Sequence, residues 1–195
     1  MIALIRKTYA RFLTHKTPGA LPVAISIDPA LSADPYTNGF FFKTTFSLVG
    51  DTVCVNGNIF SGSFQEDGGG AEMRIARSVE AFTLFLRCFL SLVLLRTDGL
   101  LIHASSVVEK GYGYLFAGKP DAGKSTIVTL SRGREILSDE HSLVRREQGA
   151  WYVYPSPFWS DFVPGKHLSA RTRIPLAGVY VLCKSRSEER RVGKE

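Results

Sequence analysis

Cysteine is scarce in this sequence of 195 residues, which contains only Cys54, Cys88 and Cys183. No two of them form a C-x-x-C pair, so the pattern excludes a disulfide framework and gives no zinc site. An odd, sparse cysteine count is typical of the reducing cytoplasm, and the N-terminus has no cleavable secretory signal. We therefore expect a cytoplasmic protein.

Long hydrophobic runs are also missing. The apolar residues 88–95 lie between Arg87 and Arg96, and this stretch is far shorter than the ~20 residues that span a bilayer. A membrane span is the rival interpretation of this region. We expect instead one long buried helix over residues 72–96, which contains neither proline nor glycine.

A basic stripe with interleaved aromatic residues is absent too, although the chain has a net charge of +6 and a pI near 9.3. Without such a stripe, we do not expect binding to DNA or RNA. A mildly basic protein suits polyanionic ligands such as nucleotides. The sequence does not indicate the oligomeric state.

The chain divides into three parts by pattern. Residues 1–70 predict a mostly β region, with a strand over 22–27 and an antiparallel meander over 40–64. Residues 71–183 predict a nucleotide-binding domain that begins with the long helix. Residues 184–195 form a charged tail that we interpret as foreign to the fold, so that the natural chain continues beyond Cys183. The alternative is a natural solvated tail.

The most specific motif is a nine-residue segment that fits the phosphate-binding pattern G-x-x-x-x-G-K-[ST]: Gly118-Lys119-Pro120-Asp121-Ala122-Gly123-Lys124-Ser125-Thr126. Predicted strands over residues 100–108 and 112–117 precede it, and residues 127–130 can continue as a helix. Glycines at both ends of the loop permit sharp turns and a close approach of backbone to phosphate. A glycine-rich turn with an exposed lysine is the alternative.

In such a loop the backbone N–H groups attract an anion. The pattern predicts that Lys124 reaches the phosphates of ATP and that the Ser125 hydroxyl binds Mg²⁺. Asp139-Glu140 follows a strand-like Ile136-Leu137, and Asp139 is the best candidate for a second Mg²⁺ ligand. Its neighbour Glu140 is a candidate proton acceptor.

Two histidines lie close to these motifs in the sequence. His103 falls in the strand before the loop strand, where a phosphate-facing role competes with that of a hydrogen-bonded core histidine. His141 follows the acidic pair and could reach the same site. We include His103 among the candidate catalytic residues, with Lys124, Asp139 and Glu140.

Four segments resemble, in this order, the catalytic domain of HPr kinase/phosphorylase and the wider group of HPr-kinase-like proteins: Ile102-His103-Ala104, Leu115 to Thr126, Arg132-Gly133 and Leu137 to Glu140. The resemblance covers residues 100–162. It implies a compact P-loop domain of α/β (α+β) class, related to ATP-type phosphoenolpyruvate carboxykinase. It also implies bound ATP and Mg²⁺, with Lys124 on the phosphates and Ser125 and Asp139 at the metal.

On this basis we expect an ATP- and Mg²⁺-dependent, HPr-kinase-like phosphotransferase or ATPase, acting on a protein or small-molecule phosphoacceptor. Two alternatives stay open. One is a nucleotide-binding accessory module, for example in peptide modification, that transfers nothing. The other is an inactive fragment that lacks residues beyond Cys183.

Overall fold

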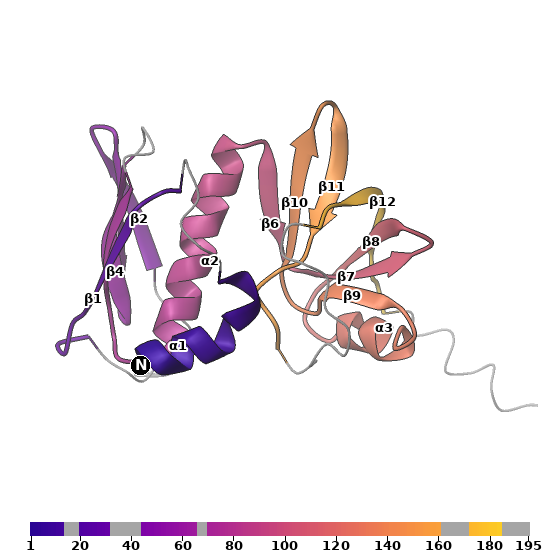
Figure 1. The fold of residues 1–195 in the computed structure, drawn as a ribbon, viewed down its shortest axis with the longest axis horizontal. Helices are drawn as coiled ribbons and strands as arrows, with labels where there is room; N and C mark the ends of the chain where they lie inside the picture. Colours follow the sequence, from indigo (N-terminus) through magenta and orange to yellow (C-terminus); the bar gives the residue numbers. More distant parts are fainter. Residues whose placement is uncertain (14–19, 32–43, 66–69, 161–171, 185–195) are drawn as a thin grey trace, which may run out of the picture. The chain divides into compact units, whose positions relative to one another are not determined.

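The computed structural model describes residues 1–13, 20–31, 44–65, 70–160 and 172–184. Residues 1–92 and 93–195 form two compact units, and the division falls within the long helix (Figure 1). One sheet belongs to each unit, and three α-helices accompany them in the described residues. The mixed α/β class predicted from the sequence is therefore confirmed. The boundary predicted at residue 70 adjoins residues 66–69, which lie outside the described part, and stays a prediction.

The first unit is built on a five-stranded sheet. Its strands in spatial order are β1 (Val23–Ile27), β5 (Ala71–Ile75), β4 (Phe60–Gln65), β3 (Thr52–Gly57) and β2 (Thr44–Val49). Strands β2 to β4 form the antiparallel meander predicted over residues 40–64. Strand β5, which was not predicted, pairs antiparallel with β4, and β1 adds to β5 in parallel. Residues 40–43 of the predicted meander lie outside the described residues. Helix α1 (Ile2–Thr8) and a 3₁₀ turn (Ala10–Phe12) open the chain.

The long helix is shorter than predicted, because its expected first residues form strand β5. Residues 71–75 alternate strictly between buried and exposed, which is the period of a strand. Helix α2 (Val79–Arg96) begins after Ser78, whose hydroxyl accepts a hydrogen bond from Ala81 N at 3.0 Å. No helix in the described part of the chain is long and apolar enough to cross a membrane.

Helix α2 packs on one face of this sheet through aromatic side chains. Phe85 is 2% exposed, and its ring lies 6.4 Å from Phe64 and 5.8 Å from Phe89. The inward residues of β3, β4 and β5 complete this core, including Val55, Phe60 and Ile75. Burial of these large apolar side chains against the sheet is what fixes α2 in place.

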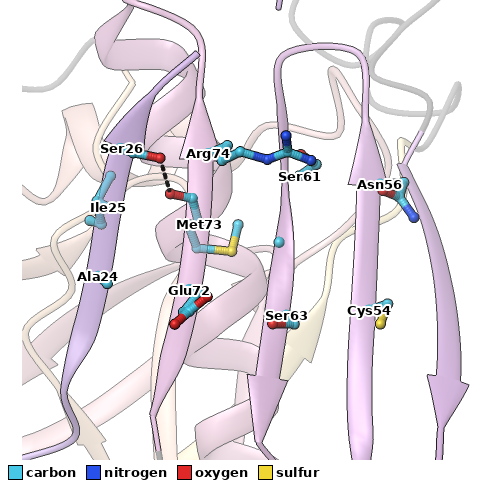
Figure 2. A pocket seen from close by; sticks show the side chains of 11 residues that line it. Ala24, Ile25, Ser26, Cys54, Asn56, Ser61, Ser63, Glu72, Met73 and Arg74 are labelled. Atoms are coloured by element: carbon cyan, nitrogen blue, oxygen red, sulfur yellow. Dashed lines mark hydrogen bonds between the residues drawn. The ribbon is translucent and has the colours of Figure 1, made fainter.

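The opposite face of the five-stranded sheet carries small and polar side chains and contains a hollow of about 650 Å³. Figure 2 shows its lining, in which Glu72 and Arg74 project from β5 and Ser61 and Ser63 from β4. Strand alternation explains the difference between the two faces, since every second residue points away from α2.

The second unit contains a seven-stranded sheet and helix α3 (Lys124–Leu130). The strand order is β6 (Gly99–Ile102), β10 (Ser142–Glu147), β11 (Ala150–Tyr154), β12 (Ile174–Val181), β8 (Tyr112–Ala117), β7 (Ala104–Glu109) and β9 (Glu135–Ser138). The single strand predicted over residues 100–108 is two strands that divide at His103. β6 pairs with β10, whereas β7 pairs with β8 and β9, so the chain changes partners at this residue.

Both faces of this sheet bury apolar residues. On one face, Leu115 and Leu137 pack with Val144 and Val153 of the β10–β11 hairpin. On the other face, Val128 of α3 packs against neighbouring strands β7 and β9. Because α3 is only seven residues long, this contact rather than helix propensity holds it in place.

The β10–β11 hairpin carries a tyrosine with a shifted pKa. The pKa of Tyr154 is raised to about 12. The main cause is burial of the side chain, and the second is the hydrogen bond that its hydroxyl donates to Glu147. The same hydrogen bond is the main cause that lowers the pKa of Glu147, followed by the bond from Arg173. The hairpin thus couples one phenol to one carboxylate.

We expect one tyrosine of the folded protein to titrate near pH 12, measured by ultraviolet absorbance at 295 nm. Because its folded pKa is raised, the stability that protonated Tyr154 contributes is present below about pH 10 and is lost as pH rises toward 12. In Glu147→Gln this step should move to lower pH. An unchanged titration curve in that variant would contradict the assignment.

Candidate functional site

The loop predicted to bind phosphate joins β8 to α3, so a strand precedes it and a helix follows it. Both of its motif glycines are required by the backbone. Gly123 has φ 104°, in the left-handed region that disfavours side chains. A Cβ atom at Gly118 would lie 2.9 Å from Ala122 Cβ and 3.1 Å from Leu182 O. The loop is therefore a tight turn packed against the end of β12.

Lys124 is the buried charge of this loop. Its residue is 9% exposed, and Nζ donates hydrogen bonds to Gly118 O at 2.8 Å and Lys119 O at 3.1 Å. Among the described residues, no carboxylate lies within ion-pair distance of this ammonium group. The lysine side chain thus reaches back across the loop, and its positive charge is met by neutral carbonyl groups alone.

Strand directions bring the other predicted residues to the same edge of the sheet. β7 is antiparallel to both β8 and β9, so β8 and β9 run in the same direction and end at one edge. The loop follows β8, Asp139 follows β9, and His103 precedes β7 at that edge. Since neighbouring strands are ~4.8 Å apart and β7 lies between them, β8 and β9 are about 10 Å apart across the sheet.

Asp139 is 5% exposed and already has hydrogen-bond partners. Its Oδ1 accepts from Ser160 N at 3.0 Å, and its Oδ2 accepts from Ser160 Oγ at 2.8 Å. Carboxylate oxygens are also the type of ligand that Mg²⁺ prefers. In this arrangement Ser160 fixes the orientation of the carboxylate.

His103, Glu140 and His141 form a small cluster beside Asp139. The rings of His103 and His141 meet edge to face at 5.0 Å between centroids. His141 Nδ1 lies 3.7 Å from Glu140 Oε1, a distance too long for a hydrogen bond. His103 is exposed, so the alternative of a core histidine is wrong.

Sequence reasoning missed the serines that support the site. Ser138 Oγ accepts hydrogen bonds from the backbone N–H groups of Glu140 and His141, at 3.1 and 3.0 Å. Ser105 Oγ donates to Lys124 O at 3.4 Å, and Ser160 holds Asp139. Serine is common in turns and has no motif of its own here, so only the tertiary structure could reveal these roles.

The donor atoms of Ser125 and Asp139 suit Mg²⁺, because it prefers hard oxygen ligands and keeps several waters and phosphate oxygens in its shell. Ser125 is exposed in the first turn of α3. Within the described ranges, no group of three or more His, Cys, Asp or Glu side chains could hold a metal ion by itself. A cation here would depend on phosphate oxygens for part of its shell.

Residues 74–192, more than half of the chain, match the model of a protein family described as SynChlorMet cassette protein ScmC. No curated protein matches the chain. The description of the matched family names a cassette and no reaction.

This match overturns the resemblance to HPr kinase/phosphorylase, because the matched family is neither an HPr-kinase nor a P-loop family. The predicted kinase-like phosphotransferase or ATPase function is wrong for the same reason. That resemblance rested on the segment around one loop and on three shorter segments, and such short patterns recur in unrelated proteins. The expected fold of HPr-kinase and phosphoenolpyruvate-carboxykinase type was based on the same resemblance, so this expectation is no longer supported. The individual roles of Lys124, Asp139, Glu140 and His103 stay predictions, as does enzymatic activity.

Proposed function

Because this chain belongs to the family of the SynChlorMet cassette protein ScmC, we propose that it serves that cassette as a binding protein for a phosphorylated ligand. The ligand is held by the loop of residues 118–126. Binding, without transfer of a phosphoryl group, is the function that we assign. We further propose that the ligand is ATP with Mg²⁺ and that the protein acts in the cytoplasm, where this nucleotide is abundant.

The observation that carries the proposal is the environment of Lys124. Lys124 is only 9% exposed as a residue, and within the described residues its ammonium group contacts the Gly118 and Lys119 carbonyls and no carboxylate. Burial of a charge without a counter-charge is unfavourable. A phosphate group placed beside Nζ supplies the missing negative charge and forms the stronger, charge-assisted type of hydrogen bond.

The surroundings of Lys124 support a ligand rather than a purely structural lysine. Gly118 and Gly123 present no side chain at the two ends of the turn, where a ligand can approach the backbone closely. The hydroxyl of Ser125 is exposed in the next position, and the Asp139 carboxylate lies at the same sheet edge. In this arrangement Lys124 binds phosphate oxygens, while Ser125 and Asp139 hold Mg²⁺ directly or through water.

Isothermal titration calorimetry tests the proposal on the wild-type chain. We expect ATP to bind in the presence of Mg²⁺ and to bind at least about tenfold more weakly when EDTA removes the metal, because the carboxylate of Asp139 then repels the phosphates. Mass spectrometry of the ligand recovered afterwards should show intact ATP. Absence of heat with ATP, with or without Mg²⁺, would contradict the proposed function.

A further inference from the structure

A row of aromatic rings lies on the face of the second sheet that carries α3, close to the loop. The Tyr180 ring stacks on Phe116 with 5.5 Å between centroids and an interplanar angle of 17°. The centroid of the Tyr114 ring lies 6.4 Å from that of Tyr180, with 33° between the ring planes. Phe116 packs against the apolar residues beneath α3, whereas Tyr180 is 52% exposed. Tyr180 is therefore an aromatic ring that Phe116 and Tyr114 support and that is still half exposed to solvent.

Tyr180 is held next to the loop by strand pairing. β12 runs parallel to β8, with Tyr180 opposite Phe116 and Val181 opposite Ala117. Leu182 N continues the pairing by donating a hydrogen bond of 2.7 Å to Ala117 O. The backbone and Cβ of Leu182 also pack closely against Gly118. Because alternate residues of an extended chain share a face, Tyr180 and Leu182 lie on the same side of the sheet.

We propose that Tyr180 provides a stacking surface for the base of a nucleotide whose phosphates occupy the loop of residues 118–126. This inference rests on the proposed function. It narrows the class of ligand, because a base-stacking ring favours nucleotides over polyphosphate without a base. The ring is suited to this role for two reasons. Stacking on Phe116 fixes its orientation before the ligand arrives, and flat aromatic rings and bases prefer stacked contacts. The cost of ordering the side chain is therefore small.

The test compares ATP with inorganic tripolyphosphate, both with Mg²⁺, in calorimetric titrations of wild type, Tyr180→Ala and Tyr180→Phe. In the wild type, ATP should bind about tenfold more tightly than tripolyphosphate, as expected for one base stacked on one ring. Tyr180→Ala should weaken ATP binding by about tenfold and leave tripolyphosphate binding unchanged. Tyr180→Phe keeps the ring and should behave like the wild type.

The remaining outcomes separate this inference from the proposed function. If Tyr180→Ala binds ATP as tightly as the wild type does, the stacking role is wrong and the loop site stands. If it weakens ATP and tripolyphosphate equally, Tyr180 supports the loop rather than the base, and the inference is again wrong. If neither ligand binds the wild type, both the proposed function and the inference fail.

Discussion

Lys124→Gln should raise the dissociation constant for ATP and Mg²⁺ by about 100-fold, measured by isothermal titration calorimetry. The reason is that the substitution removes the buried positive charge that meets the phosphates, while the amide can still donate a hydrogen bond toward Gly118 O. The loop should keep its shape, so the urea midpoint of unfolding should change little. Binding, rather than folding, is the property that this variant tests.

The matched control is Lys110→Gln. Lys110 is exposed in the turn between β7 and β8, at the sheet edge opposite the loop. Lys110→Gln removes one positive charge, as Lys124→Gln does, so a general effect of net charge on ATP affinity would appear in both variants. We expect its dissociation constant to stay within about twofold of the wild type, since distant exposed charges are screened by salt. Equal losses in the two variants would argue against a loop site.

Phe85→Ala should lower the free energy of unfolding by about 3–5 kcal/mol, the usual cost of a large cavity in an aromatic core. Phe85 is 2% exposed and contacts the rings of Phe64, Phe82 and Phe89. Its removal leaves a cavity in the core between α2 and the five-stranded sheet. Urea unfolding followed by far-ultraviolet circular dichroism measures the change.

Leu95→Ala provides the comparison within the same helix. Leu95 is 64% exposed, so its truncation should change the free energy of unfolding by less than about 0.5 kcal/mol. A loss for Phe85→Ala no larger than that for Leu95→Ala would show that α2 does not depend on this aromatic cluster.

Much of the fold could be predicted because local patterns agreed with the tertiary structure. The meander of β2 to β4 and the long buried helix α2 were both predicted from the sequence. Residues 72–75 were misjudged, because without proline or glycine they resemble a helix, and only pairing with β1 and β4 makes them a strand. The division at His103 was hidden for a similar reason, since a change of strand partner leaves no local signal.

The candidate site was predictable only where a residue type carries its own chemistry. The glycines and Lys124 of the loop belong to a spacing with a physical meaning, and β8 and α3 form on either side of them as expected. Ser160 and Tyr180 were not found, because their importance comes from contacts made across 21 residues to Asp139 and across the β8–β12 pair. Motif spacing also failed to give the family, since a short loop carries too little information to identify it.

Nuclear magnetic resonance of ¹⁵N-labelled protein tests the central claim, phosphate binding at the loop, most directly. On titration with ATP and Mg²⁺, the amide signals of Gly123, Lys124 and Ser125 should shift most, because the N–H groups at the start of α3 have no acceptor within the helix and can bind the phosphates. Saturating shifts confined to this loop and the nearby end of β12 would agree with our account. Shifts that instead appear around Ser63 and Glu72, in the hollow of the first sheet (Figure 2), with an unchanged loop, would contradict it.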